Sequence, residues 1–443
     1  MPSPTQCFEP TIVSVEPPVP FDQALRGLRD WRGLVALDSS GGHPARHSWI
    51  AFDPIESAEG WRGWQDLRAA LDRWRTEAAI PGPFHGGFLG ALGYELGVAG
   101  ESLDLPPEPW GWPNLLGGLY TDFLVFDHQQ GTLHLVVRGG SDRVESVLAS
   151  LRQPGPAQPI AVGALQRHTP AATHMERIEV ARKDIAAGEY YQVNLAHRFS
   201  APMQGDPLDL YLRLRSANPA PYAGFLRGSC GACLSSSPEL LLEFDGTSAR
   251  TRPIKGTAPR YADPVADLAA RDALWNSPKD RAELAMIVDL ERNDLGRIAQ
   301  AGTVRVQQFP ELESYARVHH LVATVSATPR PGVDAVDLLQ ALFPGGSITG
   351  APKLASMEAI ARLEQEGRGL FTGSLGFVDF RGHAHFNILI RTVLWRPLGV
   401  GQGEISFRVG GGITWASDPA AEDQETLHKA HGMVDAWGAG DLS

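Results

Sequence analysis

Strand-like and helix-like segments follow one another in this chain without strict alternation, and this order most constrains the fold. Residues 32–40 and 47–54 are expected to be strands of one sheet, and residues 122–139 a hairpin around Gln130–Gly131. Residues 63–79 have the apolar spacing of a helix. A doubly wound parallel sheet needs a helix after nearly every strand. The pattern therefore predicts an α+β fold.

A segment rich in proline and glycine, residues 152–170, interrupts this pattern. It predicts an N-terminal region over residues 1–155 and a second region over residues 165–440. In the second region we expect three helices with identifiable starts. The first has Thr173 and Glu176 at the capping-box spacing and Gly188 at its C-cap. The second starts at Ser277–Pro278 and runs through residue 294, and the last starts at Asp418–Pro419. Strands are expected over 229–244, 374–380, 386–395 and 405–413.

Composition excludes several classes of protein. The net charge of −12 on 443 residues argues against binding of nucleic acid or an anionic membrane. The first ten residues have no basic and apolar leader pattern, and no apolar run has the length of a membrane span. Three cysteines fit a reducing cytoplasm, and the Cys230–Cys233 pair is interpreted as core filling because it lies in a strand-like segment.

Acidic residues on two predicted helices suggest a metal site. Glu422, Glu425 and Lys429 share one face of the last helix, which is also the pattern of a solvated charged face. Glu283 lies beside apolar residues of the 278–294 helix and needs a partner. Mg2+ prefers one or two carboxylates plus water and an anionic substrate group, so Glu283 and Glu425 could hold it together.

Other segments lack the motifs of nucleotide binding, dinucleotide binding and glutamine hydrolysis. The glycine-rich segment 343–353 lacks the Gly-Lys-Ser/Thr ending of a nucleotide phosphate loop, although Pro352 could start a helix whose free N–H groups suit a carboxylate. Residues 367–376 do not match the dinucleotide fingerprint, and no G-x-C-x-G glutaminase nucleophile motif occurs. One lysine, Lys255 in "RPIKGTAPR", is either a solvated loop charge or a nucleophile.

Long motifs in this second region resemble the chorismate-utilising enzymes, in the family's order. The resemblance covers residues 170–435 and is weaker over the first 150. It implies an α+β sandwich of two large, mainly antiparallel sheets with helices outside. The motifs are "GEYYQVNLAHRFS", "NPAPYAGFL", "SSSPELLL", "RPIKGTAPR", "DRAELAMIVDLERNDLGR", "FPGGSITGAPK", "FNILIRT" and "GGGITWASDPAAEDQET".

Two positions separate branches of this family. Members that aminate chorismate at C4, for p-aminobenzoate and folate synthesis, typically carry a lysine at the position of Lys255, where other branches carry a small residue. Water-activating members carry a lysine where this chain has Gln192. The resemblance therefore implies C4 amination through a covalent Lys255 adduct at C2. The alternatives are C2 amination with pyruvate elimination, and a non-catalytic chorismate- or tryptophan-binding relative.

The resemblance also implies roles for other residues. Glu239 is the expected general acid/base, Glu283 and Glu425 the expected Mg2+ ligands, and Glu422 an outer group. Expected substrate contacts are Gln192, Thr257, His320, Gly350, Ala351, Arg391, Gly411, Gly412 and Lys429. Two of these have ordinary alternatives, since Arg391 could be a cross-strand partner and His320 a satisfied core histidine.

The family resemblance finally implies two partners besides chorismate. Ammonia is expected from a separate class I glutamine amidotransferase subunit that forms a heterodimer with this chain. Near Ser39, the segment "ALDSS" resembles the family's tryptophan-binding segment but departs from its usual Leu-Glu-Ser. A bound tryptophan at Ser39, Pro221 and Tyr222 is therefore an expectation, and an ordinary strand end is the alternative.

Overall fold

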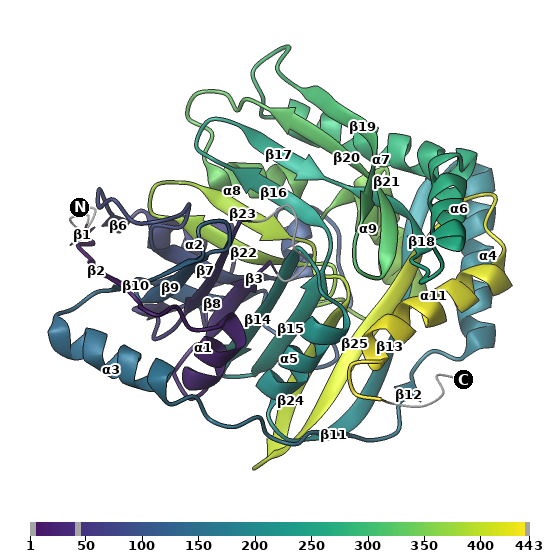
Figure 1. The fold of residues 1–443 in the computed structure, drawn as a ribbon. Helices are drawn as coiled ribbons and strands as arrows, with labels where there is room; N and C mark the ends of the chain where they lie inside the picture. The colour runs from purple at the N-terminus through teal and green to yellow at the C-terminus, as the bar shows by residue number, and fades with distance from the viewer. Residues whose placement is uncertain (1–5, 40–45, 439–443) are drawn as a thin grey trace.

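The computed structural model describes residues 6–39 and 46–438, so Ser40 of the "ALDSS" segment lies outside the described residues. Within them, the β-structure forms a sheet of thirteen strands, a sheet of ten strands and one short parallel pair (Figure 1). Neighbouring strands in both large sheets run antiparallel. This confirms the α+β fold with two large, mainly antiparallel sheets.

The first sheet contains, in spatial order, β11 (Ala161–Val162), β13 (Gln192–Gln204), β25 (Gln402–Ile413), β24 (Thr392–Gly399), β15 (Gly231–Ser237), β14 (Tyr222–Gly228), β3 (Val35–Asp38), β4 (His47–Ala51), β9 (Phe123–Asp127), β10 (Thr132–Val137) and β2 (Thr11–Ser14), with β12 (Gln166–Arg167) and β21 (Gly350–Ala351) also paired to β13. The second contains β18 (Ile254–Pro259), β20 (Val318–Ala327), β17 (Ala249–Arg252), β16 (Leu240–Phe244), β23 (Ala384–Asn387), β22 (Ser374–Asp379), β7 (Gly87–Leu92), β8 (Leu115–Tyr120) and β5 (Glu56–Ser57), with β19 (Arg305–Ser314) paired to β20. The short pair is β1 (Gln6–Cys7) with β6 (Trp74–Arg75).

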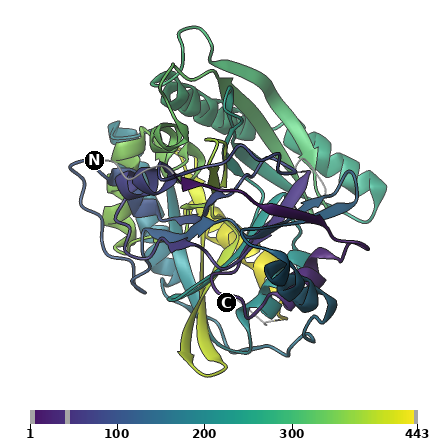
Figure 2. The ribbon, with the colours of Figure 1, turned by 90° about the vertical axis from the view of Figure 1, so that its left-hand side faces the viewer.

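Helices lie outside the sheets, as Figures 1 and 2 show from two sides. They are α1 (Phe21–Gly27), α2 (Trp64–Leu71), α3 (Ser141–Arg152), α4 (Ala171–Ala187), α5 (Pro207–Ala217), α6 (Pro264–Trp275), α7 (Pro278–Gly296), α8 (Ala335–Leu342), the short α9 (Gly346–Thr349), α10 (Lys353–Glu364) and α11 (Pro419–Val434), with a 3-10 turn at Tyr94–Val98. None of the described helices combines the length and the apolar composition needed to cross a membrane.

The largest apolar core draws side chains from both sheets. Trp49 of the first sheet packs edge-on against Phe377 of the second, with ring centroids 5.5 Å apart, and Phe84 packs against the same ring. Burial of these apolar surfaces is the main force that holds the sheets together. Each sheet mixes strands from both predicted regions, and the boundary near residues 155–165 stays a prediction.

Several local predictions are confirmed by the caps and turns. Gly131 has a φ of 66° in the turn between β9 and β10, and Gly188 ends α4 in the left-handed conformation. The side chain of Ser277 accepts the Asp280 N–H at the start of α7. The last helix begins as expected, because the Asp418 side chain accepts the Ala421 N–H.

Other local predictions are wrong. Helix α4 begins at Ala171 with Pro170 at the N-cap and no side-chain cap, so Thr173 and Glu176 lie inside the helix and form no capping box. The 63–79 helix ends at Leu71, because the following residues pair as β6 with the N-terminal β1. Tertiary pairing has overridden a local helical pattern here.

Two segments expected to be single strands each divide between the two sheets. Residues 229–244 form β15 in the first sheet and β16 in the second, with Pro238 and Glu239 at the crossing. Proline has no N–H for a strand ladder, which explains the break. Residues 386–395 divide in the same way, and Arg391 turns the chain with a φ of 51°. Glu239 and Arg391 therefore lie where the sheets meet.

Candidate active site

Lys255 lies on a strand rather than on a solvated loop. It is the second residue of β18, and Gly256, with a φ of 82°, follows it at an irregularity in the pairing with β20. The half-buried Lys255 Nζ donates to the Ser347 carbonyl at 3.2 Å. Burial lowers the pKa of Lys255, and the Glu283 and Glu239 carboxylates oppose this shift only in part. A lowered pKa increases the fraction of neutral amine, the form that acts as a nucleophile.

Glu239 is buried at the crossing between β15 and β16. One carboxylate oxygen accepts the Ile254 N–H at 3.2 Å, which places Glu239 beside the residue that precedes Lys255. Burial raises the pKa of Glu239, although Lys255 and Arg391 lie near enough to oppose this. A carboxyl group with a raised pKa can carry a proton near neutral pH and deliver it to a leaving group.

Gln192 points toward the same place from the first sheet. A Cβ at Gly412 would lie 2.9 Å from Gln192 Nε2 and 3.1 Å from Lys255 Nζ, so the two side-chain ends meet over this glycine. The Gln192 side chain is fully buried, and neither its amide oxygen nor its amide nitrogen has a hydrogen-bond partner. An unpartnered buried amide is costly unless a ligand completes it.

Glycines shape the floor beside Gln192. Gly350 and Ala351 form β21 against the start of β13, and Gly350 has a φ of 132°. A Cβ there would lie 2.1 Å from the Gln192 carbonyl oxygen, so only glycine fits. Across the strand pair, a Cβ at Gly411 would meet the Glu422 carboxylate at 3.3 Å.

A second basic group lies at the other crossing. Arg391 donates weakly to His320 Nε2 at 3.4 Å, and the His320 Nδ1 pairs with the Thr257 hydroxyl at 2.9 Å. Burial, with Arg391 nearby, lowers the pKa of His320 to about 3, so the ring is neutral. Burial also lowers the pKa of Arg391 to about 10, and the nearby Glu239 carboxylate opposes this shift only in part. The free guanidinium suits a substrate carboxylate.

The predicted Mg2+ ligands are Glu283 on α7 and Glu425 on α11, and Lys279 of α7 lies between Glu283 and the outer group Glu422 of α11. Lys279 Nζ lies 3.9 Å from Glu283 and 3.8 Å from Glu422, so the ammonium group occupies the kind of position that a cation would take. Glu425 pairs with Lys429 at 2.9 Å, and Lys429 also donates to the Gly410 carbonyl. The two helices thus offer carboxylate oxygens, the ligands that Mg2+ prefers, and a bound metal ion would take the place of the Lys279 ammonium group.

Glu283, Glu422 and Glu425 do not form one of the closely spaced groups of potential metal ligands. Among the described residues, two groups of three potential ligands lie within 4.8 Å of one another, and both are His–Asp clusters elsewhere. Mg2+ does not require such a group, because water and an anionic substrate supply most of its ligands.

Sequence reasoning missed Ser347 and Lys279. The Ser347 contribution is a backbone carbonyl, which no side-chain pattern reveals. Lys279 stands four residues before Glu283 on one helix, and this spacing could have indicated the pair.

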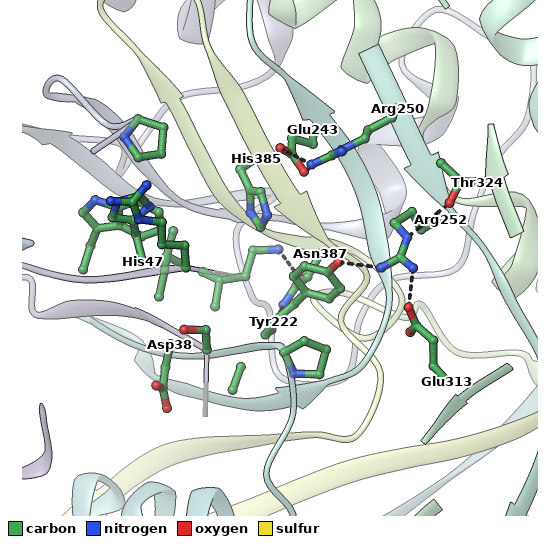
Figure 3. A pocket seen from close by; sticks show the side chains of 18 of the residues that line it. Asp38, His47, Tyr222, Glu243, Arg250, Arg252, Glu313, Thr324, His385 and Asn387 are labelled. Atoms are coloured by element: carbon green, nitrogen blue, oxygen red, sulfur yellow. Dashed lines mark hydrogen bonds and ion pairs between the residues drawn. The ribbon is translucent and has the colours of Figure 1, made fainter. Parts of the chain in front are cut away.

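A large cavity lies elsewhere, between β3, β14 and the second sheet (Figure 3). Its volume is about 500 Å3, and Ser39, Pro221 and Tyr222 all line it. Two arginines on its wall are paired, Arg250 with Glu243 and Arg252 with Glu313. The structure therefore brings the three residues of the expected tryptophan site together at one cavity.

Cys233 is buried in the core between the sheets, and Cys230 packs against that core from the turn before β15. Burial raises the pKa of Cys230 to about 11. Both placements agree with core filling, although Cys230 lies in the turn and not in the strand.

The fold and these residues define an enzyme family that binds chorismate. The family model described as "chorismate binding enzyme" matches residues 37–435, and the chain belongs to this family. Among curated relatives, anthranilate synthase component 1 from Streptomyces coelicolor is 39% identical over 91% of this chain and 83% of its own length. Aminodeoxychorismate synthase component 1 from Salmonella typhimurium is 41% identical over 80% of this chain and 77% of its own length.

Solved structures agree on the fold. Anthranilate synthase component I from Streptococcus pneumoniae superimposes with a TM-score of 0.77 at 29% identity, over 88% of this chain and 93% of that one. The menaquinone-specific isochorismate synthase from Escherichia coli superimposes with a TM-score of 0.76 at 18% identity, over 98% and 96% of the two chains. The first comparison confirms the family architecture, and the second supports the fold alone.

Proposed function

We propose that this chain is an aminodeoxychorismate synthase component 1, a transferase that aminates chorismate at C4 on the route to p-aminobenzoate and folate. One observation carries the proposal: Lys255 Nζ stands beside Gln192 at the centre of the candidate site, with a lowered pKa. The proposal treats this amine as the nucleophile.

The proposed chemistry has two steps. In the first, Lys255 Nζ forms a bond to C2 of chorismate, both ring double bonds shift (C1=C2 to C1=C6 and C5=C6 to C4=C5), and the C4 hydroxyl leaves as water after Glu239 gives it a proton. In the second, ammonia forms a bond to C4, both double bonds shift back, and the C2–Nζ bond breaks to return the lysine. The amine protons released in these steps pass to Glu239 and solvent. The sum is chorismate plus ammonia giving aminodeoxychorismate plus water.

Other side chains would hold the substrate during these steps. Arg391 is part-buried, has no ion pair among the described residues, and suits one of the two chorismate carboxylates. The unpaired Gln192 amide and the backbone around Gly411 and Gly412 would complete the polar contacts. Glu283 and Glu425, with Glu422 behind them, would hold Mg2+, which supplies positive charge for the ring carboxylate.

Ammonia is proposed to come from a separate class I glutaminase subunit. The chain has no glutaminase nucleophile motif, and the Streptomyces coelicolor and Salmonella typhimurium relatives are each named as component 1 of their enzymes. The purified chain should therefore use ammonium but not glutamine. Addition of a class I glutaminase subunit should confer glutamine-dependent activity, and glutamine use by the pure chain would contradict the proposal.

Anthranilate synthase component 1 is the second candidate, because a relative of that name is 39% identical over 91% of this chain. The deciding experiment incubates the chain with chorismate, Mg2+ and ammonium and identifies the product by chromatography. We expect 4-amino-4-deoxychorismate. Anthranilate as the product would replace the proposal with the second candidate, and no conversion would favour a non-catalytic binding relative.

The large cavity is proposed to accept tryptophan, as the sequence resemblance implies. Support comes from its volume, from the three expected residues on its wall, and from apolar neighbours such as Leu37 and Trp49. Calorimetric titration with L-tryptophan should show one site, and Ser39→Trp should fill the cavity and abolish binding. Absence of binding at millimolar tryptophan would leave the segment an ordinary strand end.

A further inference from the structure

Three potential metal ligands converge outside the candidate active site, at one end of the neighbouring strands β7, β22 and β23. His85 precedes β7, Asp379 ends β22, and His383 precedes β23. His85 Nδ1 lies 2.7 Å from Asp379 Oδ2, and His383 Nδ1 lies 3.3 Å from the same oxygen. Nitrogen and oxygen ligands about 2.1 Å from one Zn2+ ion lie at comparable distances from one another.

The carboxylate is held in one orientation by the backbone. Asp379 Oδ1 accepts the N–H groups of Arg381 at 3.0 Å and His383 at 2.7 Å, which leaves Oδ2 directed at the two imidazoles. The Arg381 guanidinium turns away and donates to the carbonyls of Thr76 and Ala78. The buried negative charge therefore has only histidines beside it, and hydrogen bonds of this kind orient metal ligands in proteins.

His383 is the loosely held member of the cluster. Its Nδ1 is shared between Asp379 Oδ2 at 3.3 Å and the Pro83 carbonyl at 3.4 Å, and neither distance is that of a strong hydrogen bond. Its side chain is 27% exposed, whereas that of His85 is 8% exposed. The cluster is thus preorganised on its buried side and open to solvent on the other.

We propose that His85, Asp379 and His383 form a binding site for a divalent transition-metal ion of the Zn2+ class. Two imidazole nitrogens and one carboxylate oxygen are the protein ligands, and a water molecule takes the open position toward solvent. Both histidines bind through Nδ1 as neutral rings, so the Nδ1 proton that each shares with Asp379 leaves to solvent and each ring carries its single proton on Nε2. Mg2+, which prefers oxygen ligands, does not compete for this site.

The second His–Asp cluster shows why ligand types alone do not suffice. His174, His197 and Asp423 are all buried, and Asp423 already forms an ion pair with Arg167. A cation there would meet the guanidinium charge without solvent screening. His197 is also held by the Thr426 hydroxyl at 2.8 Å. We therefore assign the metal to the His85 cluster only.

Metal at this site would act on the wall of the large cavity. Pro83, whose carbonyl His383 contacts, lines that cavity, as does His385 two residues farther along the chain. Coordination would draw His383 away from Pro83 and connect three strands through one ion. The site is independent of the proposed chorismate chemistry.

The test measures metal binding by the full chain without chorismate. After removal of metals with a chelator, the protein is titrated with Zn2+ at about pH 7.5, where free histidines are mostly neutral, and with Co2+ as a spectroscopic substitute. We expect one ion per chain and the visible absorption bands of Co2+ in a low-coordinate nitrogen–oxygen site. Millimolar Mg2+ should not displace either ion.

Variants locate the ion. His383→Ala removes a part-exposed ligand, and its affinity should fall by about 100-fold or more. The matched control is His134→Ala, a part-buried histidine of β10 outside the cluster, which should keep the parental affinity. Three outcomes would overturn the proposal: no Zn2+ binding at micromolar concentrations, equal binding by His383→Ala, or sulfur-to-cobalt absorption bands that place the ion on a cysteine such as Cys7.

Discussion

The candidate active site and the large cavity both contain charged side chains, but they differ in how those charges are compensated. In the cavity, Arg250 pairs with Glu243 at 2.6 Å and Arg252 forms an ion pair with Glu313. In the candidate site, Lys255 has a carbonyl partner and Arg391 has only a weak contact to a neutral histidine. The two regions are neighbours along the chain, since Arg252 and Lys255 are three residues apart.

This difference separates a binding cavity from a reactive site. Paired charges leave the cavity polar but electrically satisfied, so it can exist empty at little cost. Unpaired buried groups such as the Gln192 amide are costly until a substrate completes them. Burial in the same site lowers the pKa of Lys255. The cavity of about 500 Å3 is thus not where the chemistry is expected.

The largest expected effect concerns metal. Glu283→Gln or Glu425→Gln should abolish turnover, and so should excess EDTA, because either treatment removes the positive charge that anchors the ring carboxylate. The measurement is chorismate consumption with ammonium as donor. Glu358→Gln, on the exposed side of α10, is the matched control. Full activity in EDTA would contradict the metal prediction.

Lys255→Ala should lower C4 amination by about 10³-fold or more, because it removes the proposed nucleophile. Ammonia could then reach C2, so a C2-aminated product is the expected side product. Mass spectrometry of the parent enzyme with chorismate and no ammonia should show an adduct on the Lys255 peptide. Lys183→Ala, exposed on α4, is the control. Parental C4 amination by Lys255→Ala would eliminate the lysine mechanism.

His320 should make stability depend on pH. Its pKa is about 3 in the folded chain, chiefly through burial, against 6.5 for an ordinary histidine. The unfolded chain therefore takes up a proton below pH 6.5 that the folded chain refuses, and stability falls as pH decreases from 6.5 toward 3. The loss from this residue is about 2 kcal/mol at pH 5. Denaturant unfolding of His320→Gln should lose about 2 kcal/mol less stability than the parent between pH 7 and pH 5. An equal loss in both proteins would contradict the prediction.

The smallest effect is expected in the cavity. Arg250→Gln breaks a pair whose side chains are 49% and 33% exposed, and such pairs contribute less than about 1 kcal/mol. Turnover should stay within about twofold of the parent, because this charge is already compensated and lies outside the candidate site. Thermal unfolding and a chorismate assay measure both quantities. A large loss of activity would show that the two regions are coupled more tightly than their charges suggest.

Sequence patterns predicted the elements whose signals are local. Ser277, Asp418 and Gly188 cap their helices as expected, because a cap depends on a few adjacent residues. The 63–79 pattern failed, because strand pairing with residues far away in the chain shortened the helix. The roles of Lys255 and Glu239 came from long motifs that resemble one family, and these roles stay predictions.

The sequence by itself determined the α+β class, the family membership and the residue types available for catalysis, since these follow from periodicity and motifs. Only the tertiary structure decided that Lys255 lies on a part-buried strand, that Glu239 and Arg391 stand at crossings between the sheets, and that Lys279 sits between acidic side chains. The physical reason is that burial and charge compensation depend on groups distant in sequence. The same neighbouring residues could surround a lysine in a solvated loop or a lysine on a part-buried strand. Only the packing of distant groups around it decides its pKa.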